Sequence, residues 1–215
     1  MANKLMSKVF SWMFIGLLIT FFTGIFVGTN EYTTAKLLSG KSYLMLVIVE
    51  LVLVIVLSVR ITKMSPTSAR ICFLLYSFVT GITFGGIFLA YSLSSVMYTF
   101  LMTSLIFGAC AVIGYTTKMD LTKMGTYLIV GLFGVIICSI VNIFLKVPAL
   151  EMILSIVTII IFLGLTAYDV QKIQKLEGII PEENLPIYGA LELYLDFINI
   201  FLKLLQFFGN SKNKN

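Results

Sequence analysis

Seven apolar runs of about 20 residues follow one another along the chain, and only short polar links separate them. A helix needs about 20 apolar residues to cross the hydrocarbon core of a bilayer, so each run is long enough to span a membrane. None shows the alternation of apolar and polar residues that marks a membrane β-barrel. We therefore predict an all-α integral membrane protein that forms one transmembrane domain over residues 1–215. The expected spans are residues 9–28, 43–60, 70–91, 95–116, 124–145, 150–171 and 186–208.

The composition supports a membrane protein and argues against most enzymes. Of the 215 residues, 59% are hydrophobic and 12% are charged, whereas soluble domains carry roughly 25% charged residues. The net charge of +5 comes from residues in short links and tails, which favours a lipid bilayer over nucleic acid as the partner. The chain contains no histidine, the commonest general base and metal ligand. We therefore expect no catalytic activity and no tightly bound cofactor.

The basic residues predict an orientation in the cell membrane. Nine of them share one side if the chain crosses at every apolar run, which predicts a cytoplasmic N-terminus for this multi-pass protein. The C-terminal lysines belong on that side by the same rule, yet seven crossings place them on the other. A re-entrant last segment would remove this conflict, although residues 186–208 are long enough to cross fully. The nine residues are Lys4, Lys8, Arg60, Lys63, Arg70, Lys118, Lys123, Lys172 and Lys175.

The last apolar run contains an acid near its middle. Placing an ionised side chain such as that of Asp196 at the bilayer centre costs at least about 2.5 kcal/mol. At 100° per residue, the polar side chains of this run fall on one narrow stripe, while leucine and isoleucine cover the other directions. We predict a helix inside a bundle with one face on a polar cavity; the alternative is an amphipathic helix at the membrane surface. The stripe consists of Tyr188, Glu192, Asp196, Asn199, Lys203 and Gln206.

Three further charged residues are candidates for function. Asp169 closes the sixth run on the predicted cytoplasmic side, where it either pairs with Lys172 at a helix end or joins Asp196 as a carboxylate pair. Glu50 lies deep in the second run between branched apolar residues, a position that normally faces a cavity or a partner. Arg60 ends the same run and either serves the site or reaches the lipid phosphates.

Two motifs resemble those of the transmembrane Bax inhibitor motif family, including its bacterial members, and the resemblance covers nearly the whole chain. It implies a seven-helix fold whose last helix is enclosed by the other six, acting as a pH-sensitive calcium leak. The family's paired aspartates match Asp169 and Asp196, its pairing arginine matches Arg60, and its acid within the second helix matches Glu50. The motifs are Tyr168-Asp169-Val170-Gln171 and Leu193-Tyr194-Leu195-Asp196-Phe197-Ile198-Asn199, followed by Leu204-Leu205 and Phe208-Gly209.

Calcium takes oxygen ligands, which carboxylate and amide side chains supply. Glu50, Glu192 and Asn199 are therefore expected to line an ion route, with Asp169 and Asp196 as calcium contacts. Calcium ions and protons are then the small partners of the chain, with calcium as the transported ion. Two facing aspartates share a proton, so the pair is expected to sense pH. Arg60 bonded to the ionised pair would keep the cytoplasmic end shut.

Two other functions use the same residues. An intramembrane aspartyl protease also needs two aspartates on consecutive helices, but such proteases carry Gly-x-Gly-Asp at the second acid, where this chain has Leu-Tyr-Leu-Asp. A proton-coupled transporter would use acids within the membrane as a relay, but the sequence shows no internal repeat and no pair of helices broken by glycine or proline. A purely regulatory role through partner proteins also remains open.

Overall fold

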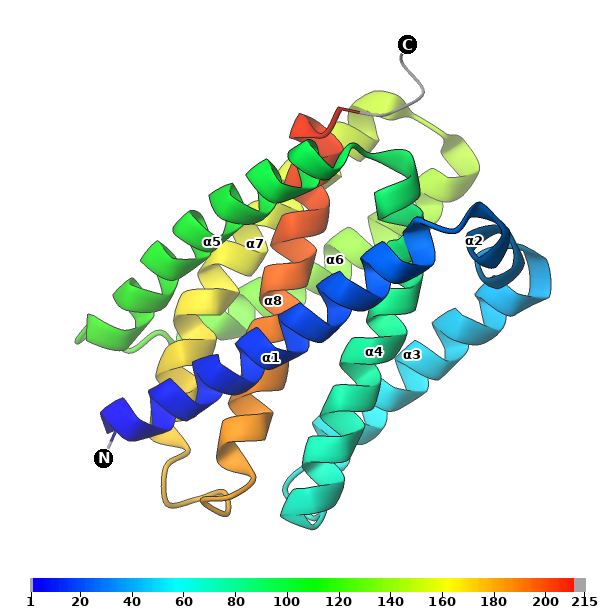
Figure 1. Ribbon diagram of the computed structural model, residues 1–215. Coiled ribbons are helices and arrows are strands. Elements are labelled where there is room, and N and C mark those ends of the chain that lie inside the picture. Colours follow the sequence, from blue (N-terminus) through cyan, green and yellow to red (C-terminus); the bar gives the residue numbers. More distant parts are fainter. Residues whose placement is uncertain (1, 211–215) are drawn as a thin grey trace. The chain divides into compact units, whose positions relative to one another are not determined.

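The computed structural model describes residues 2–210, and within them the chain is helical, as predicted (Figure 1). Seven helices are long and apolar enough to cross a membrane; the exception is the seven-residue α2. The predicted all-α membrane fold with seven spans is therefore confirmed. The helices are α1 (Ala2–Gly28), α2 (Glu31–Leu37), α3 (Gly40–Arg60), α4 (Pro66–Ala90), α5 (Leu93–Thr116), α6 (Thr122–Leu145), α7 (Pro148–Lys175) and α8 (Leu185–Phe208).

The helices extend beyond the predicted spans at several ends. The first starts at residue 2 instead of 9, and α7 continues to residue 175 instead of 171. These extensions carry lysines, which hydropathy excludes from a lipid-spanning segment although the helical backbone continues into the polar layer. The short α2 is polar and was not predicted. Hydropathy therefore located the membrane-crossing part of each helix and missed its polar ends.

Local sequence signals set several helix ends. The side-chain oxygen of Ser65 accepts a hydrogen bond from the backbone N–H of Ser68 at 3.2 Å, and Pro66 occupies the first helical position of α4. Further along the chain, Lys146 terminates α6 in a left-handed conformation with φ of 53°. Pro148 then begins α7, so the link between α6 and α7 contains only two residues.

The chain divides into two compact units, which we describe separately. Of the described residues, the first unit contains 2–96, 176–194 and 210, and the second contains 97–175 and 195–209. In the first unit, α4 contacts both α1 and α3 (Figure 1). A Cβ added at Gly28 would lie 2.7 Å from the carbonyl oxygen of Gly85, so only glycine permits this approach of α1 to α4.

In the second unit, α6 packs along α7. Helix α5 meets α7 at Gly114, where an added Cβ would lie 2.7 Å from the Cα of Ala167. Two hydrogen bonds from Gln206 and Ser155 join the end of α8 to the start of α7. The second unit is thus built from α5, α6, α7 and the later part of α8.

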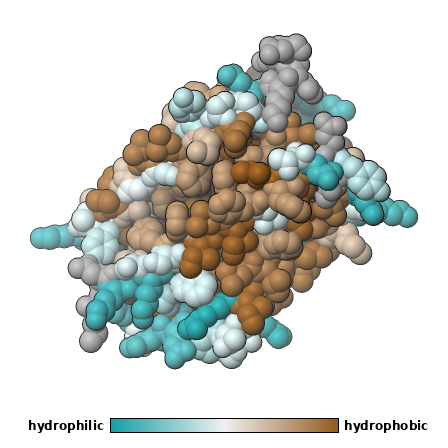
Figure 2. All heavy atoms as spheres, viewed as in Figure 1, coloured by the Kyte–Doolittle hydropathy of each residue, from teal (hydrophilic) through white to brown (hydrophobic). Residues whose placement is uncertain are grey.

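Helix α8 is the most buried of the seven spans. In its most apolar 18-residue window, 72% of the residues are buried, whereas the share is 6% in both α3 and α6. The exposed side chains of α3 and α6 are mostly apolar, as a lipid-facing surface requires, and most of the face seen in Figure 2 is coloured hydrophobic. Burial of α8 contradicts the alternative of an amphipathic surface helix. Its enclosure by the other six helices stays a prediction, as does the single domain.

The last helix also bears on the question of a re-entrant segment. It is one unbroken helix of 24 residues, which gives a length of about 36 Å at 1.5 Å per residue. A re-entrant segment turns back within the membrane and needs a break in its helix. The unbroken course of α8 therefore favours a full crossing.

Candidate functional site

Both predicted aspartates are buried in the second unit. Asp169 lies near the end of α7 with 5% of its surface exposed, and Asp196 lies in α8 with 3% exposed. Carboxylates are rarely so buried unless they are paired or functional, and within a membrane span the cost of burial is higher. Their burial agrees with a position inside the protein, and their role as functional residues stays a prediction.

Lys172 supplies a positive charge to the first aspartate. Its Nζ lies 3.6 Å from Oδ1 of Asp169 and 5.8 Å from the centre of the Tyr168 ring. This is the helix-end ion pair that the sequence left open as an alternative. Asp169 is buried as well as paired with Lys172. The ion pair therefore does not exclude the predicted carboxylate pair of Asp169 with Asp196.

Two hydrogen bonds and two glycine contacts fix the segment of α7 that carries Asp169. The backbone N–H of Leu121 donates to Oε1 of Gln171 at 2.9 Å, and Nε2 of Gln171 donates to the carbonyl oxygen of Met119 at 2.8 Å. These bonds attach α7 to the link between α5 and α6. Two glycines then bring neighbouring helices against the same segment: α5 packs on the backbone of Ala167 through Gly114, and α6 packs on the Tyr168 ring through Gly125.

Aromatic rings position the neighbourhood of Asp196. The ring of Phe197 packs edge-on against Phe100 and Phe107 of α5, with ring centres 5.2 Å and 5.5 Å apart. Such edge-to-face pairs contribute roughly 0.5–1.5 kcal/mol beyond the area they bury. One turn further along α8, Nδ2 of Asn199 donates to the carbonyl oxygen of Leu195 at 2.8 Å. Asn199 is half-buried in the same unit as the aspartates.

Glu50 lies in the first unit, within a region of hydroxyl side chains. The hydroxyl of Thr80 donates to Oε1 of the half-buried Glu50 at 2.7 Å. The hydroxyl oxygens of Thr20 in α1 and Tyr194 in α8 lie 2.6 Å apart, at hydrogen-bond distance. The Thr20 hydroxyl also lies 2.9 Å from the carbonyl oxygen of Ser77 in α4. Tyr194 is fully buried. The only carboxylate in the middle of α3 is therefore held by a polar partner inside the protein.

The remaining predicted residues also belong to the first unit. Arg60 is exposed at the last position of α3, and Glu192 is half-buried in α8. The structure thus brings Asp169, Asp196 and Asn199 into one unit and Glu50, Arg60 and Glu192 into the other. The contact of Arg60 with the aspartates stays a prediction.

Comparison with known proteins identifies the family. The sequence matches the family described as "Inhibitor of apoptosis-promoting Bax1" over residues 2–213. The chain belongs to the Bax inhibitor-1 family. The family resemblance inferred from the motifs around Asp169 and Asp196 is therefore confirmed.

Bacterial relatives of this Bax inhibitor-1 family member match along nearly their whole length. The "Inner membrane protein YbhL" of Escherichia coli K12 is 41% identical over 214 residues, which cover 96% of this chain and 92% of the relative. An "Uncharacterized protein" of Borreliella burgdorferi is 42% identical over 98% of this chain and 94% of the relative. Another from Deinococcus radiodurans is 38% identical over 97% and 90%. These names describe a membrane protein or leave the activity open, and none names an enzyme.

The carboxylates of the Bax inhibitor-1 chain do not form a closed metal cage within residues 2–210. In that part of the chain, no three or more histidine, cysteine, aspartate or glutamate side chains gather in a group that could hold a metal ion. Calcium requires six to eight oxygen ligands, of which Asp169 and Asp196 would supply only part. Calcium binding by Asp169 and Asp196 therefore stays a prediction.

Outside the spans, this Bax inhibitor-1 chain has an ion pair that fixes the link between α5 and α6. Nζ of Lys175 donates to Oδ1 of Asp120 at 2.5 Å, and the Thr122 hydroxyl donates to the same oxygen at 2.7 Å. The hydrogen bond from Lys175 is the largest cause that lowers the pKa of Asp120 from 3.8 to about 2, and the bonds from Thr122 add to it. The carboxylate is therefore ionised at neutral pH.

The Asp120 pair gives a pH prediction with a defined window. The folded pKa lies below the ordinary value, so the stabilisation is complete above about pH 4 and is lost between about pH 4 and 2. We expect Asp120→Asn to flatten the fall of the thermal midpoint in that window. The effect is small because Asp120 is exposed. Thermal unfolding of wild type and Asp120→Asn at pH 2–7 measures it, and identical slopes below pH 4 would contradict the prediction.

Proposed function

We propose that this Bax inhibitor-1 family protein is a pH-sensitive calcium leak channel that passes Ca²⁺ down its gradient. The observation that carries the proposal is the burial of two aspartates, Asp169 and Asp196, on spanning helices of one unit. Ionisable side chains within membrane spans are costly and mark ion or proton pathways. In this proposal the chain is a channel and not an enzyme.

The polar residues of the spans supply ligands for a moving cation. Carboxylate oxygens of Asp169 and Asp196 attract calcium electrostatically, and the amide oxygen of Asn199 replaces part of its water shell. Glu50 and Glu192 extend the negative charge along the route in the first unit. The hydrogen bond from Thr80 keeps Glu50 oriented without cancelling its charge.

Protonation of the aspartate pair is the proposed gate. Ionised carboxylates attract the guanidinium of Arg60 and the ammonium of Lys172, which holds the cytoplasmic end shut. Because a proton on the pair removes this attraction, the closed arrangement weakens as the pH falls. Calcium entry is therefore expected to rise on acidification through the range in which the pair titrates. In this proposal the two aspartates share a proton and sense pH as one pair.

A flux measurement with the purified full chain tests the proposal. Liposomes containing the protein and an internal calcium dye are given an inward calcium gradient at each pH from 5 to 8. We expect entry above that of protein-free liposomes, faster at the acidic end, that stops when the gradient is abolished. Absence of excess entry at every pH would overturn the channel. Accumulation of calcium against its gradient would instead support a proton-coupled transporter.

A further inference from the structure

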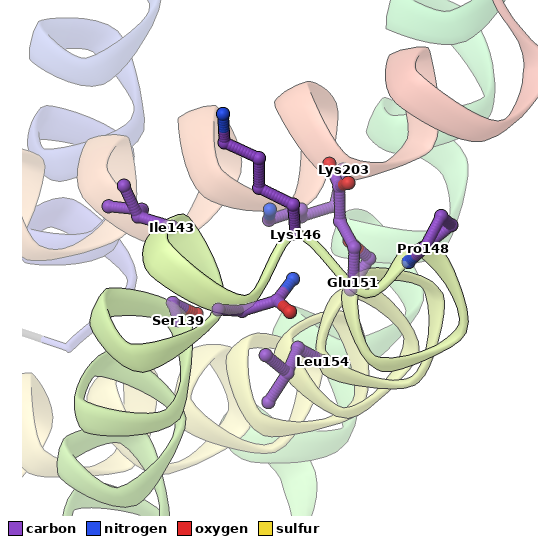
Figure 3. Close-up of a pocket in the computed structure, with 9 residues that line it drawn as sticks. Ser139, Ile143, Lys146, Pro148, Glu151, Leu154 and Lys203 are labelled. Carbon is purple, nitrogen blue, oxygen red and sulfur yellow. The ribbon is translucent and has the colours of Figure 1, made fainter.

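A cavity of about 400 Å³ lies in the second unit beside the link between α6 and α7 (Figure 3). It opens where two spanning helices end, which is the depth of the lipid headgroups. The aspartates that carry the proposed function do not line it. Its polar lining consists of Ser139, Asn142, Lys146, Glu151, Ser155 and Lys203.

The first of the two lysines is held at the rim by the link itself. Lys146 has φ of 53°, a left-handed conformation that side chains other than glycine and asparagine rarely adopt. Its backbone N–H donates to the carbonyl oxygen of Asn142 at 2.7 Å, and the N–H of Val147 donates to Oδ1 of Asn142 at 3.1 Å. A lysine in a conformation that favours glycine or asparagine suggests that its ammonium group has a function.

The second lysine comes from α8. Nζ of Lys203 lies 3.5 Å from Oε1 of Gln206, and Nε2 of Gln206 donates to Oε1 of Glu151 at 2.7 Å. Glu151 thus already accepts a hydrogen bond, and it lies in the first turn of α7, where the helix dipole stabilises a negative charge. Within residues 2–210, neither Lys146 nor Lys203 forms an ion pair. The cavity therefore offers two ammonium groups to an anion.

The surroundings of the cavity are apolar and exposed. Phe144, beside the link, has 81% of its surface exposed, and Ile143, which lines the cavity, has 67%. Met152 in α7 is also more than half exposed. A ligand that fits this surface has a negative head for the lysines and apolar chains for the exposed side chains. A free phosphate ion uses only the first of these two features.

We propose that this cavity binds the phosphate headgroup of an anionic phospholipid. The phosphate diester lies between the ammonium groups of Lys146 and Lys203, and its acyl chains run along the exposed side chains of α6 and α7. The amide nitrogen of Asn142, whose Oδ1 accepts a hydrogen bond from the backbone N–H of Val147, can donate to a headgroup oxygen. This proposal does not depend on the proposed calcium channel, and lipid binding can be tested without measuring calcium flux.

Binding of phosphatidylglycerol to the full chain in detergent micelles tests the site. Native mass spectrometry counts the lipids that remain bound, with phosphatidylcholine as the uncharged reference and glycerol phosphate as the free competitor. We expect one saturable phosphatidylglycerol site. A lysine near a lipid phosphate contributes about 1 kcal/mol, so each lysine lost should weaken binding about fivefold and both about 25-fold. The double variant is Lys146→Asn with Lys203→Gln, because asparagine tolerates the left-handed backbone.

Two controls separate the site from general charge and from misfolding. The double variant Lys36→Gln with Lys41→Gln removes the same charge from exposed residues of α2 and α3 on the same predicted side, and it should bind as wild type does. Lys146→Arg with Lys203→Arg keeps both charges and should retain binding. Equal binding of phosphatidylglycerol and phosphatidylcholine would overturn the proposal. So would wild-type affinity in the Lys146→Asn, Lys203→Gln variant, or displacement of the lipid by equimolar glycerol phosphate.

Discussion

Replacing Asp196 by asparagine is expected to remove most of the pH response of calcium entry into proteoliposomes and, at pH 5, where the proposed gate of the wild type is open, to lower calcium entry about tenfold or more. The substitution keeps the size of the side chain and one oxygen ligand, so the packing of Phe197 against Phe100 is preserved. It removes a charge that lies 97% buried, where the attraction for a divalent ion is screened less than in water. A tenfold loss corresponds to about 1.4 kcal/mol, less than a buried charge commonly contributes.

Asp169→Asn is expected to show the same two effects for a partly different reason. It also removes the ion pair with Lys172, so the variant changes the gate as well as the route. In the proposed gate the two aspartates act as one pair, so the double variant should lose little more flux than either single one. Stopped-flow recordings of dye fluorescence at pH 5–8 give rate and pH response together.

Asp120→Asn is the matched control for both substitutions. It makes the same chemical change in the same unit, at an exposed residue whose ionisation is constant from pH 5 to 8. Its flux and pH response should equal those of wild type. Unchanged flux together with an unchanged pH response in Asp169→Asn and Asp196→Asn would show that the aspartates neither line nor gate the route.

The membrane fold could be predicted from the sequence because lipid imposes a strong constraint. A span must be apolar for about 20 residues and must satisfy its own backbone, so its position follows from hydropathy alone. That constraint ends at the lipid headgroups. The predicted span therefore began several residues after the true start of α1 and ended several residues before the true end of α7. The burial of α8 was predictable as well, since its polar stripe is too narrow for a surface helix.

The candidate site was predictable only where a charge interrupts an apolar run. Asp169, Asp196 and Glu50 are conspicuous for that reason. Thr20, Thr80 and Tyr194 are not, because hydroxyl side chains are common in spans and usually bond to their own helix. Their contacts across helices depend on how four helices pack: Thr20 of α1 meets Tyr194 of α8, and Thr80 of α4 meets Glu50 of α3. The helical periodicity of polar and apolar residues shows which face of a helix is buried, but not which turn of another helix it contacts.

Packing around Asp169 gives the largest expected effect on stability. Gly114→Ala is expected to lower the free energy of unfolding by about 3 kcal/mol, at the upper end of the usual cost of overpacking. The added Cβ would lie 2.7 Å from Cα and 2.8 Å from the carbonyl carbon of Ala167. These are backbone atoms of the buried residue Ala167, so no side-chain rotation relieves the overlap. The helix α5 or α7 must move, and Asp169 is two residues from the point of contact.

Gly108→Ala on the same helix is the control, because no atom lies within 4 Å of its added Cβ. It should be neutral or stabilising by up to about 1 kcal/mol, since alanine is the better helix former. Gly125→Ala should fall between the two, because its added Cβ meets the Tyr168 ring, which can rotate where a backbone cannot. Unfolding of the three variants in detergent measures this order. Equal stability of Gly114→Ala and Gly108→Ala would contradict the prediction. It would mean that α5 and α7 do not approach each other at Ala167 as closely as the structure shows, and that α5 does not hold the Asp169 segment in place through Gly114.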